Sequence, residues 1–182
     1  ERWVDDVLHG PYEVFDASGE PLFRGAFDRG QLQGEALVRQ RDPRLGLWVR
    51  EVVNYVGGRL QGPVLGYYEN QDTRWRELHY VDGVATGTLR QWWPNENPQL
   101  EVELAWGLWQ GLMRSWHEQG GEAERCGFVL GLREGPCTRF WDNGQKKAEG
   151  TYRHNLKAPG WLYWDREGRP LTSPPDGEHE GV

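Results

Sequence analysis

Hydrophobic and polar positions alternate over short stretches of this chain, and no stretch keeps the i, i+3, i+4, i+7 spacing of an amphipathic helix. Residues 100–104, Leu-Glu-Val-Glu-Leu, show the strict period of two that is typical of a half-buried strand. Aromatic residues end the first strand of each pair, a polar turn rich in Asn, Asp and Gly follows, and a second strand returns, as in residues 140–152. The pattern predicts an all-β chain of short strands joined in hairpins.

Glycines give this pattern a fixed period. One series recurs at intervals of 24, 28, 25, 24, 24 and 25 residues. It consists of Gly10, Gly34, Gly62, Gly87, Gly111, Gly135 and Gly160. In the copies that end at Gly34 to Gly135, another glycine stands four residues earlier. In the last copy Asn155 takes the place of that glycine, and we expect it to keep the turn because Asn tolerates the left-handed conformation.

These intervals define the domain organisation that we expect. Residues 10–171 are predicted to form a single domain of about seven β-hairpin repeats, which pair with their neighbours in an elongated, twisted antiparallel sheet. Residues 1–9 are expected to form an N-terminal cap, and residues 41–44 a loop insertion that lengthens the second interval. The prolines, glycines and acidic residues of 172–182 predict a flexible C-terminal tail.

Composition narrows the classes of partner. The chain has 182 residues, with 28 acidic and 21 basic residues and a net charge of −7, and it has no block of Lys and Arg. This argues against nucleic acid or an anionic membrane as the primary partner, because both are bound through clustered positive charge. No apolar run approaches the 18 or so residues of a transmembrane helix, so no transmembrane segment is predicted. The compartment stays open: the chain begins at Glu1, and a periplasmic location after removal of an export signal is slightly favoured over a cytoplasmic one.

Residues that could carry catalysis do not converge in the sequence. The five histidines lack metal-ligand spacing, and neither a Gly-x-Ser-x-Gly elbow nor a phosphate-binding loop is present. We therefore expect a protein that is not an enzyme and that needs no metal or cofactor.

The two cysteines flank the expected turn at Gly131-Leu132 symmetrically, so Cys126 and Cys137 are predicted to lie opposite each other on neighbouring antiparallel strands. Either a disulfide or two buried free thiols would fit this position. Directly opposed strand positions strain the geometry of a disulfide, and both interpretations stay open.

Aromatic residues carry the prediction of a binding surface. Rings that recur in register can pack between repeats as a core, whereas surplus rings on the exposed face can anchor a protein partner. In the pairs Tyr67-Tyr68 and Trp92-Trp93, one ring must point away from the surface on which its neighbour packs. The candidate contact residues are Tyr67, Tyr68, Trp92, Trp93, Trp106, Trp109, Trp116 and Trp141, with Asp176, Glu178 and Glu180 in the tail.

The segment Trp141-Asp142-Asn143-Gly144-Gln145, followed by Glu149-Gly150-Thr151-Tyr152, resembles the variant MORN repeat. Tyr67-Tyr68-Glu69-Asn70 is similar to the start of the same motif, and a weaker resemblance extends over about residues 10–171. The chain looks like bacterial repeat proteins of the YwqK antitoxin type. This resemblance implies a non-enzymatic hairpin array that binds another macromolecule.

Two functions follow from this resemblance as expectations. The first is an antitoxin or immunity protein that occludes a toxic effector enzyme with its aromatic ridge, while the acidic tail enters a basic active-site cleft. If the effector is a phospholipase, Asp176, Glu178 and Glu180 would mimic the phosphate group of its substrate. The alternative is a MORN-type scaffold or membrane-tethering module.

Overall fold

The computed structural model describes residues 3–4, 6–42, 44–69 and 72–175. Contacts between Cα atoms divide the chain into two compact units, Glu1–Gly87 and Thr88–Val182, and each unit is described by itself. The described residues contain strands and turns but no α-helix. The predicted all-β class of tandem antiparallel hairpins is confirmed.

The first unit pairs its strands with their neighbours in chain order. Antiparallel pairs join β3 to β4, β4 to β6, β6 to β7, β7 to β9 and β9 to β10, while β1 and β2 form a separate two-stranded pair. Its strands are β1 (Trp3–Val4), β2 (Val7–Leu8), β3 (Gly10–Phe15), β4 (Pro21–Asp28), β5 (Gln31–Leu32), β6 (Gly34–Arg41), β7 (Trp48–Val56), β8 (Arg59–Leu60), β9 (Gly62–Tyr68) and β10 (Arg74–Val81). Strand β11 (Val84–Trp92) runs from this unit into the next.

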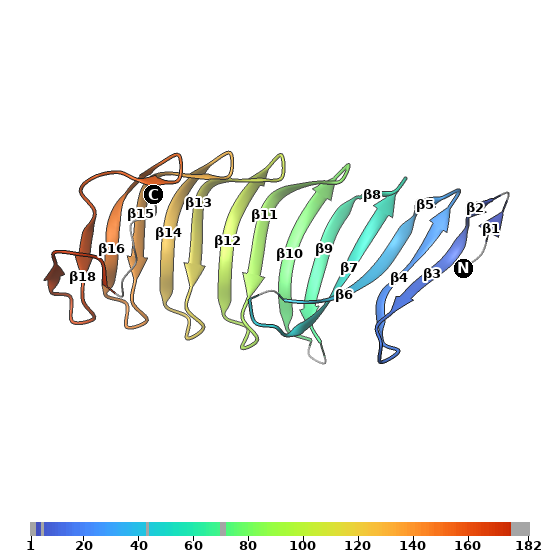
Figure 1. Ribbon diagram of the computed structural model, residues 1–182, viewed down its shortest axis with the longest axis horizontal. Helices are drawn as coiled ribbons and strands as arrows, with labels where there is room; N and C mark the ends of the chain where they lie inside the picture. The colour runs from blue at the N-terminus through green and yellow to red at the C-terminus, as the bar shows by residue number, and fades with distance from the viewer. Residues whose placement is uncertain (1–2, 5, 43, 70–71, 176–182) are drawn as a thin grey trace. The chain divides into compact units, whose positions relative to one another are not determined.

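The second unit repeats the plan more regularly. From β12 to β16 each strand pairs antiparallel with the next, so the strands lie side by side in chain order (Figure 1). Its further strands are β12 (Pro98–Ala105), β13 (Leu108–Trp116), β14 (Glu122–Val129), β15 (Leu132–Phe140), β16 (Lys146–Arg153), β17 (Leu156–Lys157), β18 (Leu162–Trp164) and β19 (Pro170–Leu171).

The glycine period predicted from the sequence has a backbone cause. All seven glycines of the series, from Gly10 to Gly160, have φ between 73° and 94°. At Gly111 and Gly135 a built Cβ would meet nothing within 4 Å, so the left-handed backbone rather than crowding requires glycine there. Asn155 has φ 70°, so the prediction that it keeps the turn of the last copy is confirmed.

The two ends of the hairpins carry different turns. At the upper edge of Figure 1, the turn between β12 and β13 and the turn between β14 and β15 each have two successive residues with positive φ, Trp106-Gly107 and Leu130-Gly131, which is the geometry of a type I′ turn. At the opposite edge the amide of Gly144 donates to the carbonyl of Trp141 at 3.0 Å, and Gly144 alone has positive φ within its turn. The predicted Asn143-Gly144 hairpin is therefore a type I turn followed by a left-handed glycine.

One face of each unit's sheet is buried. In the second unit this inner face holds one cluster, made up of Leu100, Val102, Met113, Cys126, Phe128, Cys137 and Tyr152. In the first unit Val49, Tyr68 and Trp75 form a separate cluster. The insertion between β6 and β7 contributes to that unit's packing, because buried Asp42 accepts the indole N–H of Trp75 at 2.6 Å.

Candidate partner-binding surfaces

The structure separates the predicted aromatic residues into buried and accessible groups. Tyr68 is 2% exposed and packs in the first unit's core, whereas Tyr67 is half-buried, with the Arg50 guanidinium 5.5 Å from its ring centre. The two neighbours thus differ as the strand alternation predicts. Trp109 is half-buried against the inner-face cluster, with its ring 5.0 Å from that of Phe128. Trp141 is 9% exposed and belongs to the buried group.

Three ring nitrogens form a ladder between successive turns. Trp93 donates its indole N–H to the carbonyl of Trp116 at 3.0 Å, and Trp141 donates to the carbonyl of Trp164 at 3.1 Å. His117 holds the position between them, with Nε2 3.1 Å from the carbonyl of Phe140, so its Nε2 carries the proton. In all three contacts the ring and the carbonyl belong to residues 23 positions apart in the sequence. Trp93, Trp141 and His117 therefore stabilise the stacking of repeats.

The first accessible surface is an outer aromatic stripe, which we define as Trp92, Trp116, Phe140 and Trp164. These residues recur every 24 positions on β11, β13, β15 and β18, and all four side chains are half-buried. Cations lie over three of the rings. Arg114 lies 5.2 Å from the ring centre of Trp116, Arg125 5.1 Å from that of Phe140, and Lys146 5.7 Å from that of Trp164.

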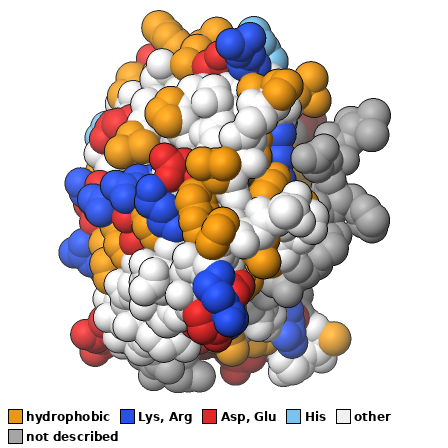
Figure 2. Space-filling view, turned by 90° about the vertical axis from the view of Figure 1, so that its left-hand side faces the viewer, with side chains coloured by type: hydrophobic (Ala, Val, Ile, Leu, Met, Phe, Trp, Pro, Cys, Tyr) orange, Lys and Arg blue, Asp and Glu red, His pale blue; other side chains and the backbone are white. Residues whose placement is uncertain are grey.

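A pit of about 300 Å³ opens between Trp92 and Trp116. Gln91, Pro98, Leu100 and three charged residues complete its lining. Arg90 pairs with Glu101 at 2.9 Å, and Arg114 pairs with Glu122 at 3.0 Å, so the charged groups at the mouth are neutralised within the chain. Figure 2 shows the same mixture at the β18 end, where blue and red side chains adjoin one another with orange ones between them. The pit suits an uncharged side chain between two indoles.

The second accessible surface is an apolar tip row, which we define as Trp106, Leu108, Leu130, Leu132 and Leu156. Trp106 is 84% exposed and Leu130 is 61% exposed, and both occupy the first left-handed position of their turns, with φ of 56° and 49°. Neighbouring tips are in contact, because the amide of Gly131 donates to the carbonyl of Trp109 at 2.9 Å.

The first left-handed position of the turn is polar or small in the first unit, where Arg29, Gly57 and Asp82 stand in place of Trp106 and Leu130. After the turn glycine the first unit has exposed Gln31 and Arg59 but also Val84, which is 41% exposed, where the second unit has leucines. A type I′ turn prefers Asn, Asp or Gly at its first central position. Apolar residues at the first left-handed position are therefore a property of two tips of the second unit, at Trp106 and Leu130, and not a requirement of the turn.

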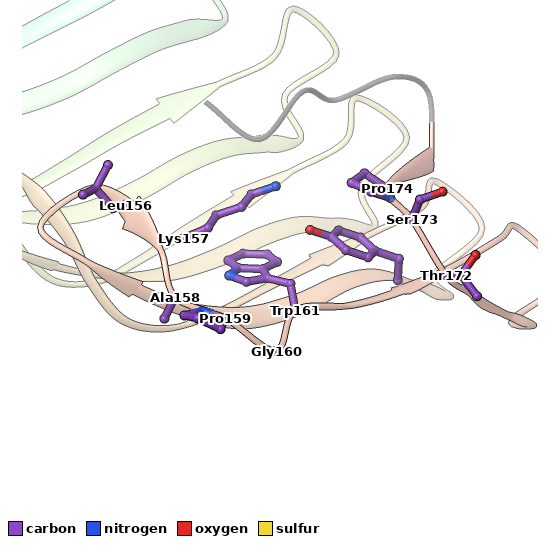
Figure 3. Close-up of a pocket in the computed structure, with 10 residues that line it drawn as sticks. Leu156, Lys157, Ala158, Pro159, Gly160, Trp161, Thr172, Ser173 and Pro174 are labelled. Carbon is purple, nitrogen blue, oxygen red and sulfur yellow. The ribbon is translucent and has the colours of Figure 1, made fainter. Parts of the chain in front are cut away.

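A groove of about 940 Å³ lies at the C-terminal end of the second unit. Lys157 extends over Trp161 on one side, and Thr172, Ser173 and Pro174 line the other side (Figure 3). The indole of Trp161 rests on Gly150, where a built Cβ would come within 2.3 Å of the ring. The groove is thus shaped by an aromatic ring that only a glycine in β16 can accommodate.

The predicted opposition of the two cysteines is confirmed. Cys126 and Cys137 are direct partners in the register of β14 and β15, with their Cα atoms 4.1 Å apart, and the structure joins them in a disulfide. Glu124 lies beside them with its Oε1 3.2 Å from Cys126 Sγ. The three side chains could group around a metal ion. However, the carboxylate already binds Arg139 at 3.1 Å and Arg133 at 3.4 Å, and thiols bridged to each other cannot act as thiolate ligands.

The contact residues predicted from the sequence leave out two members of the stripe and the leucines of the tip row. Phe140 and Trp164 stand 24 residues apart in line with Trp92 and Trp116, so the repeat period places them at the same strand position as those two predicted contacts. The tail residues Asp176, Glu178 and Glu180 lie outside the described residues, and their predicted contact with a partner stays a prediction.

Comparison with known proteins supports the repeat type. Residues 133–154, which run from β15 through β16 to the next tip, match the family model described as the MORN repeat variant. The resemblance to MORN repeats is confirmed for this segment, and the match does not extend to the YwqK-type subfamily. Comparison with curated proteins found no relative. Among the described residues, no helix has the length and hydrophobicity needed to cross a membrane.

Proposed function

We propose that this chain is a non-enzymatic repeat protein that binds one protein partner through the apolar tip row, and that it acts as an antitoxin or immunity protein by covering a toxic effector enzyme. The MORN repeat variant at residues 133–154 supports a binding array, since such repeats are associated with scaffolding. That the partner is a toxic effector enzyme is the more specific part of the proposal.

The observation that carries the proposal is the position of Trp106. A left-handed backbone costs a residue with a Cβ about 1–2 kcal/mol, and Trp gains no local hydrogen bond that would offset this cost as Asn or Asp can. The ring is 84% exposed, so it gains almost no burial within the chain either. Leu130 repeats both features at the next tip. Backbone strain combined with exposed apolar surface is typical of a site that is completed by a binding partner.

Steric inhibition, in which the chain covers the effector enzyme, fits the described surface better than catalysis by the chain does. The tip row offers aliphatic and indole surface, and aromatic anchors of this kind contribute much of the energy of protein interfaces. Stoichiometric binding would block the effector sterically. The contribution of Asp176, Glu178 and Glu180 to a phosphate-mimicking contact with a phospholipase stays part of this hypothesis.

The test uses a variant that should keep its fold. Trp106→Asn with Leu130→Asn places a favoured residue at each turn and removes the apolar tips. Wild type, this double variant and Asp82→Asn, the same change at the matching turn of the first unit, are used as bait in a lysate of the source organism. We expect wild type and Asp82→Asn to retain one enzyme that the double variant loses.

The captured enzyme then decides between modes of action. Titration of its activity with purified wild-type chain should reach full inhibition at one chain per enzyme, and the double variant should not inhibit. Inhibition at far below one equivalent would indicate that the chain acts catalytically and would overturn the proposal.

The alternative function, a membrane-tethering scaffold, has a separate test. Exposed Trp and Leu side chains can also enter a lipid surface. Pelleting with vesicles that contain phosphatidylserine should leave the wild-type chain in solution. Clear pelleting that the double variant abolishes would assign the tip row to the membrane and would replace the proposed function.

A further inference from the structure

We propose that the outer aromatic stripe is a second binding site, which takes an extended proline-rich segment in the polyproline II conformation. The site uses Trp92, Trp116, Phe140 and Trp164 and shares no residue with the apolar tip row. It therefore goes beyond the proposed function and can hold if that function fails.

The spacing of the rings selects the conformation of the ligand. The four residues lie on alternate strands of the second unit, since one strand separates β11 from β13, β13 from β15, and β15 from β18. Neighbouring strands are about 4.8 Å apart, so successive rings recur about every 9.6 Å across the sheet. A polyproline II helix presents every third residue on one face, with a repeat of about 9.3 Å. Three intervals of the stripe therefore match about nine residues of ligand.

Other backbone conformations fit this spacing less well. In a β-strand laid across the stripe, residues three apart span about 10 Å but point to opposite faces, so only one of them can meet the stripe. An α-helix repeats its face at about 10.5 Å every seven residues, but its diameter of about 10 Å requires a wide apolar trough. The mouth of the pit is instead flanked by the ion pairs Arg90–Glu101 and Arg114–Glu122. A narrow ligand fits between these side chains.

The chemistry of the stripe also favours proline. Proline-rich segments bind between aromatic rings and lose little conformational entropy, because their backbone is already extended. The pit of about 300 Å³ between Trp92 and Trp116 can admit a pyrrolidine ring between two indoles. Arg114, Arg125 and Lys146 hold three of the rings by cation–π contact, so the stripe is ordered before the ligand arrives.

The probe for the test is acetylated decaproline, which is about 31 Å long in the polyproline II conformation and covers the four rings. It is titrated into the full chain while the indole N–H resonances are followed by NMR. We expect the resonances of Trp92, Trp116 and Trp164 to shift and that of Trp106 to stay unchanged. A Gly-Ser peptide of equal length should shift none of them.

Two substitutions complete the experiment. Trp116→Ala should weaken decaproline binding at least about tenfold, because it removes one wall of the pit. Trp106→Ala should leave it unchanged. If Trp116→Ala does not fold, Trp92→Ala takes its place, and the shifts in the wild-type chain remain a sufficient readout. Absence of any shift with about 1 mM decaproline, or equal binding by the stripe and tip variants, would overturn the proposal. Neither outcome bears on capture of an enzyme by the tip row.

Discussion

At the scale of single residues, the left-handed positions of the turns show where the sequence departs from what the backbone favours. Asn155 and the register glycines follow the preference, whereas Trp106 and Leu130 do not. We expect Trp106→Asn to raise the free energy of unfolding by about 1 kcal/mol, because Asn can adopt the left-handed conformation at lower cost. Urea denaturation monitored by circular dichroism measures the change. Asp82→Asn, at the same turn position, should change stability little, and a loss of stability in Trp106→Asn would contradict the strain that we assign.

A second residue-scale prediction concerns the glycine beneath Trp161. Gly150→Ala should lower the free energy of unfolding by about 1–3 kcal/mol, because the new methyl group overlaps the indole ring at 2.3 Å and must displace it. Chemical denaturation tests this value. Gly121→Ala is the matched control, since its Cβ would meet only a carbonyl oxygen at 3.8 Å and should cost little. Equal effects of the two substitutions would argue against close packing of Trp161 on Gly150.

A third prediction at this scale follows from the turn after β3. The Ser18 hydroxyl, followed by the backbone amides of Glu20 and Ser18 and then by Arg39, stabilises the charged carboxylate and lowers the pKa of Asp16 from 3.8 to about 2. A lowered pKa in the folded state stabilises the protein above pH 3.8, and this contribution is lost as the pH falls from 3.8 towards 2. Asp16→Asn should therefore lose less stability than wild type over that interval. NMR titration of Asp16 with a midpoint near 3.8 would refute the assignment.

Residue identity alone predicted some of these features and not others. Glycine and asparagine reveal left-handed positions because their conformational preferences are local. Burial is not local: Tyr67 and Tyr68 are adjacent and chemically identical, yet only Tyr68 joins the core. Alternation showed that the two rings point to opposite faces, but the buried face was determined by Val49 and Trp75 on other strands.

At the scale of elements, the β14–β15 hairpin makes the clearest prediction. Its disulfide between Cys126 and Cys137 closes a short loop, and such a cross-link stabilises by about 2–3 kcal/mol through the entropy of the unfolded chain. Air-purified protein in denaturant should show no titratable thiol, and reduction should lower the denaturation midpoint. Two thiols titrating without reductant would show that the cysteines are free. Alanine at both positions serves as a control, because reductant should then change nothing.

The period of 24 residues predicted the positions of the strands and turns well, but it did not predict the side-chain contacts between neighbouring repeats. It located the turns that begin at Trp93, His117 and Trp141, because a turn depends on a few neighbouring residues. It did not reveal that their ring nitrogens bind carbonyls 23 residues away. Trp and His share little in a hydropathy pattern, and only the position of their N–H donors in three dimensions relates them.

At the scale of the whole molecule, repeat proteins are stabilised mainly by contacts between neighbouring repeats. Here the two units have separate buried clusters, one that includes Met113 and one formed by Val49, Tyr68 and Trp75. Because the clusters are separate, we predict that a destabilising substitution in one cluster lowers the stability of the repeats of its own unit first. The two proposed surfaces, the tip row and the stripe, both belong to the second unit, so their binding should depend on that unit's stability.

Met113→Ala tests this dependence. Met113 is 3% exposed, and its truncation should cost about 2–5 kcal/mol where the cavity forms. Hydrogen exchange should show faster exchange for amides of β12, β13 and β14, while amides of β7 and β9 next to Val49 and Tyr68 keep their protection. Val49→Ala should produce the reverse pattern. Uniform acceleration in both units by either substitution would mean that they unfold as one cooperative body, and binding at the second unit would then depend equally on every repeat of the chain.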